Sequence, residues 1–382
     1  MKVTVLAMLM LLASSVGAPA QAGERPRARE AGVVIGSLPT GARNALVDVP
    51  GVAVGHASVR QGKDIRTGVT AILPHGGDWY RERVPAAIHV ANGYGKLLGV
   101  TQVVELGELE TPILLTGTLS VWKAADALVA WQLARPGMQQ VRSLNPVVGE
   151  TNDGFLNDIR ARPVTAAHVR QALATARTDN VEEGSVGAGT GTVAFGWKGG
   201  IGTSSRVVEI EGVRHTVGVL VQSNYGGDLV VAGVPMRGVL PDPAVLARGP
   251  EQAPASGDGS IMTVLATDAP LDARQLERLA KRTVTGLART GTSMSNGSGD
   301  YVIAFSTADS MRRRNGQAPP SSQVLDNNAM DALFVAAAEA SEEAILNSLF
   351  RADSMDGHRG RVPGLPLPAV LQALEQHGRL AR

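Results

Sequence analysis

The strongest candidate for a nucleophile in the sequence is Ser260, which follows Gly259 directly and begins a long apolar run. The chain contains no cysteine, which excludes a thiol nucleophile, a disulfide framework and a thiolate metal site. Its seven histidines form no HExxH motif and no close pair at helical ligand spacing. We therefore expect neither a metal nor a cofactor, and a hydroxyl, an amine or a carboxylate has to supply any nucleophile.

Gly259 and Ser260 together suit a hydrolase that cuts its own chain. Glycine lets a scissile peptide adopt backbone conformations that a Cβ atom forbids. The Ser260 hydroxyl could attack the Gly259 carbonyl to form an ester, and water would then release Ser260 as a new N-terminus. An α-amine has a pKa of about 7.7–8.0, against about 10.4 for lysine, so near neutral pH it can act as base toward its own hydroxyl. The alternative is a serine that merely ends a turn before a strand.

The composition of the chain changes sharply at Ser260, from polar and Pro/Gly-rich to apolar. Residues 237–259 are rich in Pro, Gly, Ala and polar residues, which is typical of an exposed linker or loop. Ser260 then begins the run SIMTVLATDAP, which predicts a strand buried on both faces. Asp272 is placed to cap a helix that runs to about Thr290 with one apolar face.

Short apolar runs separated by Gly, Asp and Pro predict many further strands, and helical apolar spacing predicts a smaller number of helices. The predicted strands cover residues 45–49, 52–54, 69–73, 112–116, 147–149, 193–196, 216–222 and 301–306. The other predicted helices cover residues 121–133, 165–177 and 327–349, and residues 367–374 form the first part of a shorter helix. This mixture predicts an α/β fold in which helices cover sheets.

The first residues have the features of a secretory signal. Lys2 gives a positive start, Val5 to Leu12 form an apolar run, and Ala20-Gln21-Ala22 is a small-x-small cleavage site. We expect a signal peptide over residues 1–22, a mature chain from Gly23 and a periplasmic location. The alternative, a membrane anchor, is disfavoured because the apolar run is short. A net charge of +1 and 3% aromatic residues argue against nucleic acid or an anionic membrane surface as a partner.

The stretch GDGSIMTVLATDAPL, residues 257–271, resembles the self-processing site of the L-aminopeptidase/D-esterase and β-aminopeptidase family of serine peptidases. Further motifs that match this family occur in the family's order and extend the resemblance over nearly the whole mature chain. They are GARNALVDVPGVAVGH (41–56), PVVGETNDGFLN (146–157), GAGTG with KGGIGTSSR (187–206) and VGVLVQSNYG (217–226). The resemblance implies a four-layer αββα sandwich, similar in architecture to N-terminal nucleophile hydrolases but with different connectivity.

The same resemblance implies a precursor that is split into an α polypeptide, residues 23–259, and a β polypeptide, residues 260–382, which together form one catalytic domain. It further implies assembly as a homotetramer of αβ units. The expected substrates are small peptides, amides or esters, cleaved through an acyl-enzyme on Ser260.

By resemblance, Ser298 is the second serine of the site and Asp300 its paired acid, both in the run NGSGDYVIAF. Residues at i and i+2 of an extended chain share a face, which allows these side chains to converge. The β-aminopeptidase branch has glutamate in place of Asp300, which leaves open whether the shorter side chain reaches Ser298 directly. Asn224 matches an oxyanion-stabilising asparagine, and turn geometry before Gly226 is its alternative role.

Glu150 and Asn152, in the segment GETNDG, resemble part of a substrate pocket. A carboxylate there could bind the free ammonium group that an aminopeptidase has to recognise. Capping or turn formation is the alternative role for each residue.

Two other functions stay open at this point. One is an acyltransferase related to the ornithine acetyltransferases, against which a serine at 260 and a signal peptide both argue. The other is a non-catalytic periplasmic binding protein on the same fold, for which the purified chain would remain in one piece.

Overall fold

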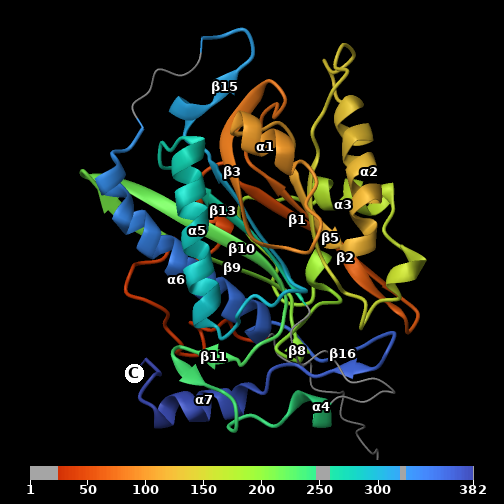
Figure 1. Cartoon of the computed structure of the whole chain (residues 1–382), viewed down its shortest axis with the longest axis vertical. Helices are drawn as coiled ribbons and strands as arrows, with labels where there is room; N and C mark the ends of the chain where they lie inside the picture. The colour runs from red at the N-terminus through yellow and green to blue at the C-terminus, as the bar shows by residue number, and fades with distance from the viewer. Residues whose placement is uncertain (1–24, 247–258, 319–323, 382) are drawn as a thin grey trace, which may run out of the picture.

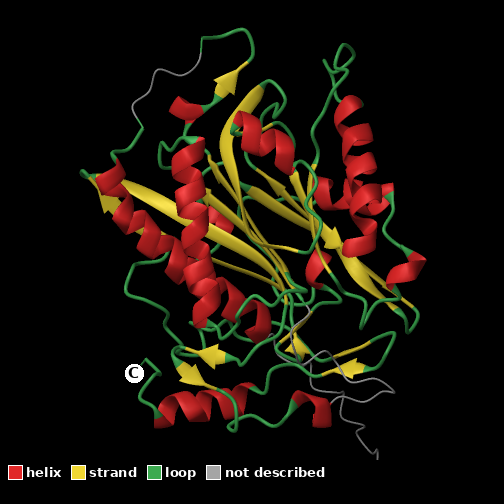
Figure 2. Ribbon diagram, viewed as in Figure 1, coloured by secondary structure: helices red, strands yellow, loops and turns green. Residues whose placement is uncertain are grey.

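The computed structural model describes residues 25–246, 259–318 and 324–381, and in it two β-sheets lie face to face between two pairs of helices (Figure 1). The layers are helix, sheet, sheet, helix, which confirms the predicted αββα arrangement. Figure 2 shows the strands gathered in the middle and the covering helices on both sides. The predicted signal peptide and residues 247–258 of the predicted linker lie outside the described residues.

The smaller sheet has four strands in the order β1-β2-β5-β6, and only β5 and β6 are parallel. These strands are β1 (Ala53–Gln61), β2 (Ile65–Leu73), β5 (Ile113–Gly117) and β6 (Val147–Thr151). The larger sheet has the order β15-β3-β14-β13-β10-β9, with β4 paired to β3. Its strands are β15 (Arg313–Arg314), β3 (Glu82–Gly93), β14 (Gly299–Ser306), β13 (Ser260–Thr267), β10 (Val213–Asn224), β9 (Ile201–Ile210) and β4 (Glu108–Leu109).

Helices α2 (Val121–Leu133) and α3 (Ala166–Ala174) cover the smaller sheet, whereas α5 (Ala273–Arg289) and α6 (Asp331–Phe350) cover the larger one. The remaining helices are α1 (Val100–Leu106), α4 (Pro243–Leu246) and α7 (Leu367–Gln376). Three short hairpins are β7 (Val193–Ala194) with β8 (Trp197–Lys198), β11 (Val230–Val231) with β12 (Val234–Pro235), and β16 (Met355–Asp356) with β17 (Arg361–Val362). None of the helices within the described ranges is both long and apolar enough to cross a bilayer.

The core lies mainly between the two sheets and between each sheet and its helices. Ile72 and Leu115 of the smaller sheet meet Met262 and Val264 of β13 in the central layer. All eight residues of β13 are buried, which confirms the prediction of a strand covered on both faces. The strand that carries Ser260 is therefore held rigidly from both sides.

Some predicted elements differ from the structure. Residues 45–49, predicted as a strand, contain a 3₁₀ turn at Leu46–Asp48, because the Asp48 side chain accepts hydrogen bonds from the Arg43 and Ala45 amides. The predicted strand 193–196 stops at Ala194, since Phe195 and Gly196 have positive φ and form the turn of a hairpin. The helix predicted from 327 begins as a 3₁₀ turn, and α6 proper starts at Asp331.

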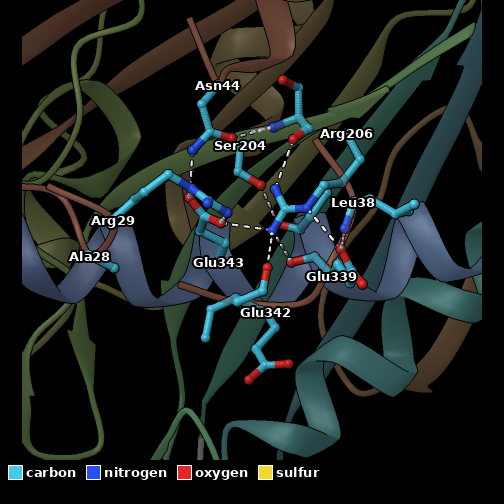
Figure 3. A network of polar contacts seen from close by, with 12 residues as sticks. Ala28, Arg29, Leu38, Asn44, Ser204, Arg206, Glu339, Glu342 and Glu343 are labelled. Atoms are coloured by element: carbon cyan, nitrogen blue, oxygen red, sulfur yellow. Dashed lines mark hydrogen bonds and ion pairs between the residues drawn. The ribbon is translucent and has the colours of Figure 1, made fainter. Parts of the chain in front are cut away.

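A buried ionic network fastens the N-terminal segment and β9 to helix α6 (Figure 3). The guanidinium of Arg206 is completely buried and lies 3.1 Å from Glu339 and 2.7 Å from Glu343. Arg29 contacts the same Glu343 carboxylate at 2.7 Å. Burial alone would raise the pKa of Glu343, but the hydrogen bond from Arg29 and the two positive charges outweigh it and hold that pKa below its ordinary value.

Candidate active site

Ser260, Asn224 and Gly299 lie side by side because of strand register. Ser260 is the first residue of β13, and it pairs with Asn224, the last residue of the antiparallel strand β10. On its other side it pairs with Gly299, the first residue of the parallel strand β14. One short stretch of sheet edge thus brings together three segments that are far apart in the sequence.

The carbonyl oxygen of Gly259 accepts two hydrogen bonds. The Ser260 hydroxyl donates to it with Oγ at 2.7 Å, and the Gly299 amide nitrogen donates at 3.0 Å. The peptide bond that would be cut is therefore already polarised by a backbone N–H group. The serine hydroxyl is next to the carbonyl that it would attack.

The reason for glycine at 259 differs from the one expected from sequence. Its φ is not in the left-handed region, so backbone conformation does not demand glycine. Crowding does: a Cβ atom would lie 2.4 Å from Cα of Tyr225 and 2.5 Å from the carbonyl oxygen of Asn224. The close approach of strand β10 leaves no space for a side chain at this position.

Ser298 and Asp300 are in direct contact. The Ser298 hydroxyl donates to Oδ1 of Asp300 at 2.6 Å, which answers the question left open by the shorter acidic side chain. Both side chains are buried, and Oδ2 of Asp300 makes no hydrogen bond of good geometry to any described residue. Burial raises the pKa of Asp300 to about 6, although the hydrogen bond from Ser298 lowers it. No direct hydrogen bond joins Ser298 to Ser260 in the described residues.

Asn92 of β3 holds the turn that carries Ser298. Its side-chain nitrogen donates to the carbonyl oxygens of Ser295 at 3.0 Å and Asn296 at 3.2 Å, and also to that of Ser298. The strand pairing of β3 with β14 shifts by one residue between Asp300 and Tyr301. A shift in register of this kind bends the strand, and here it lies at the start of β14, beside the site.

The amide of Asn224 is oriented by the glycine-rich segment that precedes β9. Its Oδ1 accepts a hydrogen bond from the Val193 amide nitrogen at 2.9 Å. Because the oxygen is engaged, the side-chain NH₂ is left as a donor, which is the orientation that an oxyanion-stabilising group requires.

A cavity of about 600 Å³ opens in front of Ser260. Its described lining consists of Tyr94, Gly95, Lys96, Thr118, Glu150, Asn152, Gly154, Phe155, Ile159, Val193, Asn224, Gly259, Ser260, Gly297 and Arg359. Four of the residues singled out from the sequence, Ser260, Asn224, Glu150 and Asn152, thus share one cavity with Gly259. This volume suits a short peptide or a compact amide.

Glu150 is a buried carboxylate in the wall of this cavity. Its Oε1 accepts a hydrogen bond from the Lys96 amide at 2.8 Å, and a Cβ atom at Gly95 would lie only 2.9 Å from the same oxygen. Burial raises the pKa of Glu150, partly countered by the positive charge of Lys96. Such a carboxylate gains strongly from a cationic ligand.

Strand β6, which carries Glu150, packs tightly against β13. A Cβ atom at Gly149 would lie 2.3 Å from the methyl carbon of Met262, so the Met262 side chain occupies the space beside this glycine. Asn152, by contrast, is exposed and accepts a hydrogen bond from the Gly154 amide at 3.0 Å. Asn152 therefore forms a turn as well as lining the cavity.

Sequence reasoning missed several residues of this site. The Gly299 amide and the Asn92 side chain act through backbone groups, which leave no signature in residue type. Lys96 and Arg359 line the cavity from loops that carry none of the motifs given above. The only available signal was the segment Tyr94-Gly95-Lys96 directly after a strand, and it was too short to interpret.

The profile of peptidase family S58 matches residues 44–363, most of the chain and every segment of the site just described. The chain belongs to peptidase family S58. This S58 peptidase is accordingly a hydrolase, a serine aminopeptidase of the self-processing, N-terminal-serine type, and the acyltransferase and binding-protein alternatives are not favoured. Family membership implies peptide or amide substrates.

Three similar proteins illustrate the relationship. Beta-peptidyl aminopeptidase BapA of Sphingosinicella microcystinivorans is 41% identical, with 97% of each chain covered. The structure of a Burkholderia sp. beta-aminopeptidase has a TM-score of 0.83 at 41% identity, covering 92% of this chain and 99% of that one. The L-aminopeptidase D-Ala-esterase/amidase of Ochrobactrum anthropi has a TM-score of 0.85 at 37% identity, covering 94% and 100%. The last is described as a variant of the Ntn hydrolase fold, and this S58 peptidase shares that fold.

Proposed function

We propose that this S58 peptidase is made as a precursor, cuts itself between Gly259 and Ser260, and then uses the freed Ser260 to remove the N-terminal residue from short peptides, amides and esters. The observation that carries the proposal is the position of Ser260. It lies at the start of a rigid strand, with its hydroxyl 2.7 Å from the Gly259 carbonyl oxygen, and it opens into the cavity that contains Glu150.

The self-cleavage step follows from this geometry. Oγ of Ser260 attacks the Gly259 carbonyl carbon and gives its proton to the Ser298–Asp300 pair, which later returns a proton to the nitrogen, and the Gly299 amide stabilises the oxyanion. The carbon–nitrogen bond then breaks as the nitrogen of Ser260 takes up a proton, which leaves an ester. Water hydrolyses the ester to a carboxylate at Gly259 and restores the hydroxyl on a Ser260 that is now N-terminal.

In turnover, the new α-amine of Ser260 acts as base toward its own hydroxyl. Ser298 can accept a proton because its own O–H already points to Asp300. Within the described residues, Oδ2 of Asp300 accepts no hydrogen bond of good geometry, and this atom can receive the charged amine of Ser260. Asn224 supplies the side-chain donor for the oxyanion of the substrate.

For the substrate, we propose that Glu150 binds the free ammonium group, with Asn152 at the edge of the same pocket. A salt bridge in this buried position fixes which residue of the peptide lies at Ser260, and so restricts cleavage to the N-terminal residue. The two Sphingosinicella relatives are named beta-peptidyl aminopeptidases at 41% and 39% identity, which favours an N-terminal β-amino acid as the preferred acyl group.

We further propose that residues 1–22 are removed on export to the periplasm, and that the α polypeptide (23–259) and β polypeptide (260–382) assemble as a homotetramer of αβ units. The support for export is the Lys2 start, the apolar run and the AQA site of the sequence, and the support for the tetramer is the resemblance to the family alone. Fractionation of cells and the mass of the native assembly in solution test these two points separately.

The deciding experiment is intact mass spectrometry of the purified protein, followed by a panel of β-, L-α- and D-α-aminoacyl nitroanilides. Two polypeptides that meet between Gly259 and Ser260, with hydrolysis of at least one substrate, support the proposal. An unbroken chain that hydrolyses substrate at full speed would overturn it, because Ser260 would then have no α-amine to act as base.

A further inference from the structure

Lys198, the last residue of β8, is completely buried, and the proposed mechanism makes no use of it. Its side-chain nitrogen donates to two backbone carbonyl oxygens, that of Gly189 at 3.0 Å and that of Gly199 at 2.6 Å. Burial lowers the pKa of the Lys198 amine well below its ordinary value, and Arg60 lowers it further, against the effect of Asp153. Because both charge states of an amine have at least two N–H donors, these two contacts do not depend on the charge.

The two carbonyl groups that Lys198 binds lie on opposite sides of the β7–β8 hairpin, since Gly189 precedes β7 and Gly199 follows β8. Thr192 makes further links between the same two positions. Its hydroxyl donates to the Gly189 carbonyl at 3.1 Å, and its own carbonyl accepts from the Gly199 amide at 3.1 Å. The Lys198 amine therefore helps to close the segment 189–199 on itself at the base of the hairpin.

This hairpin presents the backbone amide that orients Asn224. Val193 pairs directly with Lys198 in the hairpin and lines the cavity at the site. Its amide nitrogen donates to Oδ1 of Asn224 at 2.9 Å. The Phe195 amide donates to the Tyr225 carbonyl at 2.7 Å, so the hairpin also binds the residue that follows Asn224. The position of the Val193 amide thus depends on how firmly the base of the hairpin is held.

We propose that Lys198 is a positioning residue for the oxyanion donor: its amine holds the β7–β8 hairpin so that the Val193 amide keeps the Asn224 NH₂ group free to donate. This inference rests on the proposed function, since it takes Asn224 as the oxyanion donor. The terminal torsion of an asparagine is soft and roughly two-fold, so its oxygen and nitrogen exchange places with little change in shape. The exchanged state would present an acceptor to the oxyanion, and a firmly held donor at Val193 disfavours it.

The test is a double-mutant cycle between Lys198→Met and Asn224→Ala, with steady-state kinetics of the processed enzymes on an aminoacyl nitroanilide that the wild type hydrolyses. Lys198→Met keeps an unbranched side chain but removes the N–H donors. Alone, it should lower kcat about 10- to 100-fold and change KM less than about 3-fold, because a misplaced oxyanion donor is felt in the transition state. Added to Asn224→Ala, it should lower kcat by less than about 3-fold, since the donor is already gone. Lys198→Gln, whose shorter side chain keeps two N–H donors, should lose less than Lys198→Met.

Ser204→Ala is the matched control, because the buried Ser204 hydroxyl also donates to a backbone carbonyl, that of Ala340 at 2.7 Å. Ser204 pairs with Val219, well away from Asn224 along β10, so its loss should lower the melting temperature and leave kcat unchanged. An unchanged kcat in both Lys198 variants, or an equal loss with and without Asn224→Ala, would overturn the inference. A wild type that is uncut, or Asn224→Ala with the wild-type kcat, would instead contradict the proposed function, so the two failures are distinguishable.

Discussion

The hydroxyl of Ser298 donates its hydrogen bond to Asp300, with 2.6 Å between Oγ and Oδ1. Because the hydroxyl proton is used in this contact, the lone pairs of Ser298 are left to accept a proton from elsewhere. The pair is buried next to the start of β13, at the same sheet edge as Ser260. We therefore expect transfer of a proton from the Ser260 hydroxyl toward Ser298 to be favoured while Asp300 is ionised.

Asp300→Asn removes the negative charge from this pair while keeping its size. We expect self-cleavage and turnover to fall by about 10²-fold or more, the usual contribution of a positioned acid–base group. The rate of chain splitting in a purified precursor and kcat/KM on a nitroanilide are the measurements. Asp300→Glu, which restores the charge, should be faster than the asparagine variant, and wild-type rates for Asp300→Asn would remove this residue from the site.

The pH dependence of self-cleavage gives a separate prediction. Burial raises the pKa of Asp300 to about 6, so the carboxyl group is protonated below this pH and ionised above it. The precursor has no α-amine at Ser260, and its rate of splitting should therefore rise as the pH passes through about 6. In Asp300→Asn this limb should vanish; an unchanged limb would point to another buried acid.

Ser260→Ala should remain a single uncut chain without activity, because the methyl group cannot attack the Gly259 carbonyl. Intact mass and hydrolysis of a nitroanilide measure both effects. Ser298→Ala serves as the comparison, because it keeps the nucleophile and should cut slowly rather than not at all. If Ser260→Ala still splits after Gly259, another group performs the attack.

Gly259→Ala tests the crowding around the scissile bond. A Cβ atom would approach backbone atoms of Tyr225 and Asn224 at 2.4–2.5 Å, so the backbone has to move and the carbonyl shifts away from the Gly299 amide. A misplacement of this kind slows self-cleavage by about 10²-fold. Gly76→Ala, where nothing lies within 4 Å, is the control. Molecules of Gly259→Ala that do split should turn over substrate normally.

The strands and helices were largely predictable because their apolar periods are strong. The helix over 121–133 has the predicted bounds, and Asp272 caps α5 by accepting a hydrogen bond from the Gln275 amide at 2.7 Å. Residues 45–49 were predicted wrongly, because an apolar run of this length is equally compatible with a tight turn. The turn forms here because the Asp48 side chain accepts hydrogen bonds from neighbouring backbone amides.

The candidate site could be predicted only in part. Motifs in the sequence identify Ser260, Ser298 and Asp300. The backbone amide of Gly299 and the Asn92 side chain, which binds backbone carbonyls, have no such motif, and strand register brings them to the site. Arg359 reaches the cavity because the β16–β17 turn packs on Phe155 and Leu156, more than 200 residues earlier. Contacts of this range depend on the assembled sheets, and no local pattern encodes them.

Asn224→Asp separates the observed contact of the Asn224 amide with Val193 from its proposed role as an oxyanion donor. Aspartate keeps the acceptor for the Val193 amide, which lies 2.9 Å away, but has no donor for an oxyanion. We expect kcat on amide substrates to fall by about 10²–10³-fold, as for loss of one oxyanion donor. Steady-state kinetics and a melting curve check this. A loss of stability without a loss of kcat would make Asn224 a structural residue.

The network around Arg206 and Glu343 links residues on both sides of the proposed cut. Arg206→Met removes the cation shared by the buried carboxylates of Glu339 and Glu343 and leaves Glu343 with Arg29 as its remaining ion-pair partner. Breaking a buried pair in this way costs about 3–5 kcal/mol of the free energy of unfolding. Urea unfolding of the processed enzyme at neutral pH measures it, and Lys281→Met, whose pair with Glu277 is exposed, should change the midpoint very little.

The pH dependence gives the sign of this effect. The pKa of Glu343 is held below its ordinary value of 4.5, so its ion pairs stabilise the fold at and above that pH and are lost as the pH falls through the lower folded value. The difference in stability between wild type and Arg206→Met should therefore shrink in acid. Because Arg206 lies before residue 259 and Glu343 after it, the variant should also release the two polypeptides from each other at a lower urea concentration. If wild type and Arg206→Met release their two polypeptides at the same urea concentration, contacts outside this network hold the polypeptides together.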